Sequence, residues 1–207
     1  MIFKNYKLFS GANRWFAACL LAGSSLLTGC ASVYVDTATK NVPVSELKKP
    51  ASPQPVQLVF EFQNQGMPVP RATEFLQAAV KTQVAESGLF SAVATQPTAG
   101  APILNISLNN IPLNQGNAGG FVTGLTFGAV GTAVTDGYVC TVSYLPAGSS
   151  KPIVKTARHA IHTTIGNAEP PAGAKKSANV GEAVLQMTHE VLSNALRDLS
   201  QDSGFGN

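Results

Sequence analysis

The sequence predicts an α+β fold: a two-layer α/β sandwich in which two helices cover one face of a mainly antiparallel sheet. Three observations support this expectation. Several segments alternate apolar and polar residues with the period of a half-buried strand. Two longer segments repeat apolar residues at helical spacing. The order of these segments suits one sheet with helices packed against a single face.

The strand pattern is clearest over residues 56–62, where Leu58, Phe60 and Phe62 alternate with more polar neighbours. Such alternation predicts a strand with one face in the core. Similar patterns predict further strands over 89–95, 104–109, 138–145 and 153–165. The last two flank a turn-rich loop and are expected to pair as an antiparallel hairpin.

The first helix is expected over residues 72–87, with Thr73 as its N-cap and Gly88 ending it in the left-handed conformation. The second is expected over residues 178–200, with an apolar stripe for the core. Both stripes are typical of core packing, and neither indicates a cofactor site.

The domain organisation follows from composition. Residues 30–55 are rich in proline, which fixes φ and lacks an N–H donor, so they are expected to form a flexible tether. Within them, Val33–Val35 could add a short edge strand. Residues 56–200 are expected to form one domain, with a glycine-rich apolar insertion at 111–135. The polar tail, 201–207, is expected to be disordered.

The first 29 residues have the pattern of a secretory signal peptide. Lys4, Lys7 and Arg14 are followed by an apolar stretch that is shorter than a membrane-spanning helix. This stretch ends in Leu27-Thr28-Gly29-Cys30. These four residues resemble the lipobox of bacterial lipoproteins, although the resemblance covers only the first thirty residues.

This resemblance implies that signal peptidase recognises Leu27 and Gly29 and cleaves before Cys30, whose sulfur carries a lipid. The mature protein would begin at Cys30, with three acyl chains to hold it in membrane lipid. Ala31, rather than aspartate, implies sorting to the outer membrane of a Gram-negative bacterium, and we expect the domain to face the periplasm. The alternative is an ordinary cleaved signal peptide with a chance cysteine.

The charge of the chain excludes one class of partner. The whole chain has a net charge of +3, and the leader holds three bases and no acid, so the rest is balanced. Nucleic-acid binding usually needs a basic excess, and none is expected here. After removal of Cys19 and acylation of Cys30, Cys140 is the remaining thiol, and its strand position predicts a buried side chain.

The stretch from Ser87 to Thr135 contains no charged side chain. Within it, glycines recur every four residues, at Gly116, Gly120, Gly124 and Gly128. On a helix these glycines would share one face, as small residues do where membrane helices associate, while Leu125 and Phe127 would project elsewhere. Two alternatives remain open: an insertion or flap packed on its own domain, and a segment over 116–135 that enters the membrane or self-associates.

The sequence shows no catalytic, cofactor or metal-binding pattern, so we expect neither an enzyme nor a bound cofactor. His159 and His162 lie three apart on a predicted strand and so face opposite sides, which argues against a shared metal ion. His189 is expected to be exposed on the last helix. The polar sheet face either contacts only solvent or docks a partner, with Arg158 and His162 as the candidate anchors.

These observations favour a non-enzymatic, outer-membrane-anchored lipoprotein that serves as an interaction or assembly module of the cell envelope. Its expected partners are membrane lipid, through acylated Cys30, and either another envelope protein or a second copy of itself. The alternative is an oligomeric, membrane-inserting lipoprotein that uses the segment from Gly116 to Thr135. A cell-wall hydrolase ranks below both because no nucleophile and base are evident.

Overall fold

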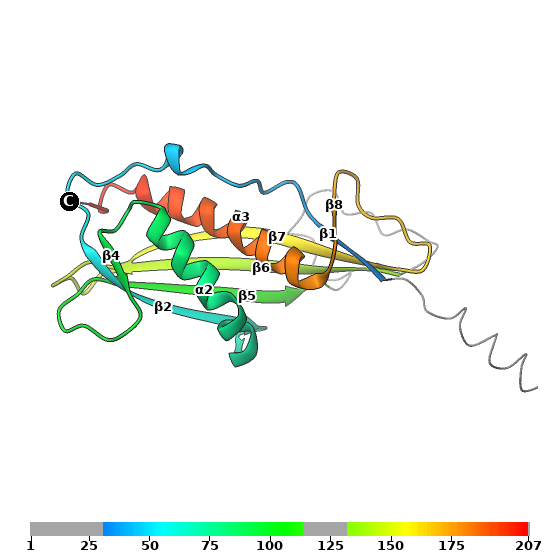
Figure 1. The fold of residues 1–207 in the computed structure, drawn as a ribbon, viewed down its shortest axis with the longest axis horizontal. Coiled ribbons are helices and arrows are strands. Elements are labelled where there is room, and N and C mark those ends of the chain that lie inside the picture. Colours follow the sequence, from blue (N-terminus) through cyan, green and yellow to red (C-terminus); the bar gives the residue numbers. More distant parts are fainter. Residues whose placement is uncertain (1–30, 114–131, 207) are drawn as a thin grey trace, which may run out of the picture. The chain divides into compact units, whose positions relative to one another are not determined.

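The computed structural model describes residues 31–113 and 132–206. Apart from Ala31, these residues belong to one compact unit that begins at Ser32. They form an α+β fold with an open, mixed sheet, which confirms the predicted fold class (Figure 1). The strands of this part of the chain are β1 (Ala31–Val35), β2 (Pro55–Asn64), β3 (Met67–Pro68), β4 (Ala92–Ala94), β5 (Ile103–Pro112), β6 (Thr132–Leu145), β7 (Ile153–Ile165) and β8 (Lys175–Ser177).

The sheet order is β3-β2-β5-β6-β7-β1-β8; β4 pairs with the first residues of β2, whereas β3 pairs with its last two. Its centre is antiparallel: β5 pairs with β6, and β6 pairs with β7 in the predicted hairpin. By contrast, β2 runs parallel to both β4 and β5. The parallel pairing follows from the helix between them, because a crossover helix returns the chain to the same end of the sheet.

Two α-helices, α2 (Pro70–Glu86) and α3 (Val180–Ser200), lie on the same face of the sheet (Figure 1). The predicted N-cap of the first helix is wrong. Pro70 occupies the first turn, Val69 is the N-cap, and Thr73 instead accepts a hydrogen bond from the Phe62 N–H of β2. Gly88 does follow the helix with a φ of +70°. Asn179 caps α3 by accepting from the Glu182 N–H at 2.9 Å.

The core lies between the sheet and these helices. Alternate residues of β5 and β6 supply the sheet side, and Leu104, Ile106 and Val142 are each at most 1% exposed. The helices supply Leu76, Val80, Val84, Met187, Val191 and Leu199. The apolar residues at every second strand position therefore pack against the apolar residues spaced nearly four apart on the helices, and together they form one hydrophobic core.

The expected tether is wrong. Val33 and Val35 are core residues of β1, an interior strand between β7 and β8. The next segment, residues 36–54, runs along α3, and we call it the strap (Figure 1). The Val42 N–H donates to Ser193 Oγ at 2.9 Å, and the Lys48 N–H donates to Ser200 Oγ at 3.1 Å.

The strap also buries two apolar side chains, Val42 and Leu47. Its prolines prevent a long helix, but they do not prevent an extended segment from packing on a helix. The folded domain therefore begins almost directly after Cys30 and not at residue 56.

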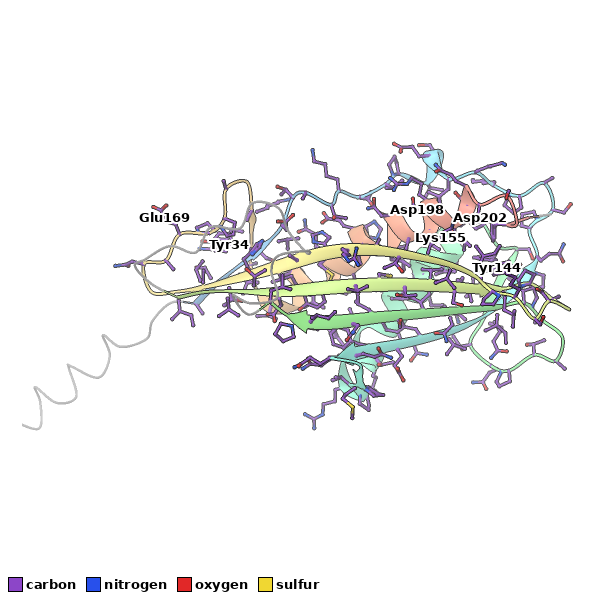
Figure 2. All side chains as sticks on the ribbon, turned by 180° about the vertical axis from the view of Figure 1, so that it is seen from behind. Tyr34, Tyr144, Lys155, Glu169, Asp198 and Asp202 are labelled. Carbon is purple, nitrogen blue, oxygen red and sulfur yellow. The ribbon has the colours of Figure 1, made fainter. Side chains whose placement is uncertain are left out.

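The expected disorder of the tail is also wrong. Phe205 is buried, and its ring lies 5.8 Å from that of Phe90 and 5.1 Å from that of Tyr144. Nearby, Asp202 pairs with Lys155 of β7 at 2.7 Å; Figure 2 shows this pair at the same end of the domain as Tyr144. The tail thus closes the end of the core where the helices finish.

The expected insertion at 111–135 is too long. Strand β5 continues through Pro112, and β6 begins at Thr132, with Pro112 opposite Asp136 in the antiparallel pair. Thr135 is 3% exposed within β6. Of the expected strand over 89–95, only Ala92–Ala94 forms, while Leu89 and Phe90 enter the core.

Candidate functional site: the polar face of the sheet

The face of the sheet opposite the helices carries aligned rows of polar side chains from three strands. The registers place Glu61 of β2 beside Ser107 of β5, and Ser107 beside Thr141 of β6. One step along, Asn105 lies between Val59 and Ser143. Neighbouring strands lie about 4.8 Å apart, so each row offers closely spaced hydrogen-bonding groups.

These rows line a shallow hollow of about 310 Å³. Its lining residues are Val59, Glu61, Gln63, Asn105, Ser107, Thr141 and Ser143. The Gln63 amide donates to the Glu61 carboxylate at 2.5 Å, which orients the single acid of the hollow. Hydroxyls, amides and one carboxylate can bind a hydrogen-bonding partner, but they do not form a nucleophile with its base.

Of the two predicted anchors on this face, only Arg158 is exposed. Strand β7 places it opposite Val139 of β6, next to the hydroxyl pair Thr141–Thr156 at 3.5 Å. His162 is wholly buried, so its predicted role as a partner anchor is wrong. The strand period correctly placed both residues on one face, but it did not indicate that other groups enclose the second.

The polar partners of the buried His162 are Thr135 and Asp36, which the sequence did not single out. Thr135 Oγ1 lies 3.0 Å from His162 Nδ1, and Asp36 Oδ2 lies 3.4 Å from His162 Nε2. The hydrogen bond with His162 lowers the pKa of Asp36, despite the opposing effect of burial; the Ala38 N–H also donates to this carboxylate. A hydroxyl, an imidazole and a carboxylate in a row resemble a catalytic triad.

This row does not have the access that catalysis needs. Thr135 is 3% exposed and His162 is 0% exposed, so a substrate carbonyl cannot reach the hydroxyl in this conformation. The row instead joins three segments distant in sequence: the start of the strap, β6 and β7. Its evident effect is structural, because each buried polar group has a partner.

A second histidine–carboxylate pair lies on the opposite face of β7. His159 Nε2 is 2.7 Å from Glu190 Oε2 of α3, and the Gln186 amide donates to the other oxygen of that carboxylate. The Ala160 N–H donates to His159 Nδ1 at 2.8 Å, which leaves Nε2 to donate to Glu190. The two histidines thus point to opposite sides, as predicted, and His189 is exposed.

Burial perturbs other groups near the same end of the sheet. It raises the pKa of Asp136, an effect that a hydrogen bond from Asn110 partly offsets. Burial also raises the pKa of Tyr138, whose hydroxyl accepts from the Asn110 amide at 3.1 Å. Among residues 31–113 and 132–206, no three potential metal-ligating side chains cluster together.

Several predicted site residues lie outside the described residues: Leu27, Gly29 and Cys30 of the lipobox, and Gly116, Gly120, Gly124, Leu125, Phe127 and Gly128 of the charge-free stretch. The described end of that stretch, Thr132–Thr135, belongs to β6. In the part of the chain that the structure describes, no helix is both long and apolar enough to cross a bilayer.

No protein-family model matches the chain, and no curated protein matches it. Among solved structures, it is similar to a putative neuraminyllactose-binding hemagglutinin homolog from Helicobacter pylori, with 14% identity over 77% of this chain and 90% of that one, at a TM-score of 0.40.

It is also similar to a PelC dodecamer from Paraburkholderia phytofirmans, with 13% identity over 81% of this chain and 98% of that one, at a TM-score of 0.34. A minor lipoprotein from Acinetobacter baumannii has 16% identity over 72% of this chain and 87% of that one, at a TM-score of 0.28. With TM-scores this low, none of these likenesses supports an argument about what the chain does.

Proposed function

We propose that this chain is a non-enzymatic lipoprotein of the bacterial outer membrane, anchored through acylated Cys30, whose polar sheet face docks another component of the cell envelope. The lipobox supports the anchor. The observation that carries the docking role is the hollow on the polar face, where aligned side chains from β2, β5 and β6 present hydrogen-bonding groups.

The chemistry of this face suits a polar partner. Hydrogen-bond donors and acceptors are both present on this face. In addition, Glu61 of β2 and Arg158 of β7 supply opposite charges. Interfaces built from such groups gain specificity from matched donors and acceptors more than from apolar area. A protein surface or a glycan can provide the complementary donors and acceptors.

Crosslinking in intact cells tests the docking role. A photoreactive amino acid is placed at Asn105 or Thr156, both exposed on the polar face, and at Lys81, which is exposed on α2, as the control. We expect a discrete adduct from the first two positions and none from the control. Equal adducts from all three positions, or no adduct from Asn105 and Thr156, would contradict the proposal.

The second candidate is an oligomeric lipoprotein whose charge-free segment enters the membrane. One observation favours it: Leu113 and Thr132 flank this segment, and both lie towards the end of the sheet where β1 begins. The test is to introduce Gly124→Asp and Leu125→Asp separately and to measure membrane insertion and self-association. Unchanged values for both variants would remove this candidate.

A further inference from the structure

The position of β1 places one end of the sheet close to the proposed anchor. Strand β1 neighbours β7, and the Asp36 N–H donates to the Ala160 carbonyl at 3.1 Å. Farther along the chain, Thr39 Oγ1 donates to the Arg158 carbonyl. The chain after β1 therefore runs antiparallel to β7, because its residue numbers rise as those of β7 fall. The start of β1 thus lies towards Ile165, at the end of β7.

The chain between this end and Cys30 is very short. Tyr34 is four residues from Cys30, and a residue of extended chain spans at most about 3.6 Å, so their Cα atoms are within about 14 Å of each other. The headgroup region of one leaflet is roughly 5–8 Å thick. A lipid on Cys30 would therefore hold β1 at the membrane surface, with no tether between them.

The side chains at this end have an interfacial composition. Ile165 and Val134, at the end of the β6–β7 hairpin, are 46% and 44% exposed, and Val180 at the start of α3 is 60% exposed. On the edge, Tyr34 lies opposite the exposed Lys176 of β8. Aromatic and basic side chains favour the bilayer interface, where rings and alkyl stems meet lipid while polar ends stay hydrated.

Resting on the proposed lipidation, we propose that this end of the sheet is a membrane-contact surface that rests on the lipid bilayer. We call it the anchor end, and it comprises Tyr34, Val134, Ile165, Lys176 and Val180. Figure 2 shows Tyr34 and Glu169 together at this end, while Tyr144, Lys155 and Asp202 lie at the other. The domain would then stand with its β7 axis rising away from the bilayer, leaving the polar face accessible from the side.

Tryptophan fluorescence tests this orientation. The chain has one tryptophan, Trp15, in the predicted leader, so a tryptophan introduced after residue 30 reports alone in the mature protein. Ile165→Trp places it at the anchor end, and Val154→Trp, at the far end of the same strand and 52% exposed, is the matched control. Both are surface positions on a strand, where tryptophan is tolerated.

The full-length protein is expressed with each change, purified in its processed form and reconstituted into vesicles that contain brominated phosphatidylcholine. We expect blue-shifted emission and several-fold stronger quenching for Ile165→Trp than for Val154→Trp. Flotation with the vesicles and the mass of the Cys30 peptide are measured on the same samples.

The outcomes separate the inference from the function on which it rests. Acylated protein that floats but shows no quenching of Ile165→Trp would overturn the inference alone, as would equal quenching at both positions. A bare Cys30, or protein that does not float, would overturn the proposed anchoring and the inference with it. Loss of quenching at Ile165→Trp upon self-association would identify a second copy as the occupant of this surface and would also overturn the inference.

Discussion

Asp36 Oδ2 lies 3.4 Å from Nε2 of the fully buried His162, and this pair joins the start of the strap to β7. The carboxylate also accepts from the Ala38 N–H at 2.6 Å, which turns the chain out of β1. The pair thus fixes the point where the first strand ends and the strap begins.

Asp36→Asn is expected to destabilise the domain by about 1–3 kcal/mol at neutral pH, because a buried imidazole loses its charged partner. The folded pKa of Asp36 lies below its ordinary value, so the carboxylate stabilises the fold above the unfolded pKa. That contribution is lost as pH falls through the depressed folded pKa. Urea unfolding at pH 7 and at pH 3 tests this. The difference in free energy of unfolding between variant and wild type should be smaller at pH 3 than at pH 7.

The control for this experiment is Glu46→Gln, an exposed acid of the strap that forms no salt bridge with any residue that the structure describes. It is expected to change the free energy of unfolding by less than about 0.5 kcal/mol. An Asp36→Asn variant as stable as wild type at pH 7 would show that the pair does not hold the strap.

Ser193→Ala is expected to loosen the strap. The Ser193 hydroxyl accepts from the buried Val42 N–H at 2.9 Å, and without it that N–H has no partner, at a cost of about 1–3 kcal/mol. Hydrogen exchange should show faster exchange at the Val42 amide. Ser45→Ala, on the exposed 3₁₀ turn of the strap, is the matched control and should leave that rate unchanged. An equal exchange rate of the Val42 amide in the two variants would contradict the prediction.

Phe205→Ala is expected to destabilise the domain by about 3–5 kcal/mol, the usual loss for a phenylalanine removed from a packed core. Its ring packs edge-on against Phe90 and Tyr144. Thermal or urea unfolding measures the loss, and Gln201→Ala, at the exposed residue that follows α3, is the control. A free energy of unfolding equal to that of the control would mean that the tail is dispensable.

Cys140 is expected to be inert towards thiol reagents at pH 8 in the folded protein. Burial raises the pKa of its thiol to about 12, so almost no thiolate forms, and the side chain is 1% exposed. In denaturant, the mature protein should take up one label per chain, at Cys140. Rapid labelling of this residue before unfolding would contradict its burial.

The sequence predicted those parts of the fold that depend on local periodicity. Leu104, Ile106 and Leu108 alternate with more polar residues because one face of β5 packs in the core and the other does not. This alternation predicted both the strand and its inward side. The closing helix was predicted to within two residues for the same reason. The parallel course of β2 and β5 depends on how α2 crosses the sheet, which no single segment encodes.

The strap and the tail could not be predicted in this way. Each is held by a few contacts that are distant in sequence: Val42 to Ser193, Lys48 to Ser200, and Phe205 to two rings. Proline is frequent in the strap and glycine in the tail, so the local sequence of both segments resembled that of unstructured chain. The burial of His162 escaped prediction because its partners come from residues 36 and 135, which carry no motif.

The proposed lipid anchor is tested most directly by the intact mass of the protein purified from membranes, followed by the mass of its N-terminal peptide. If Cys30 is the lipid anchor, the chain begins at residue 30 and carries the added mass of acyl chains on Cys30. A chain that retains Met1, or an N-terminal peptide with an unmodified Cys30, would contradict it.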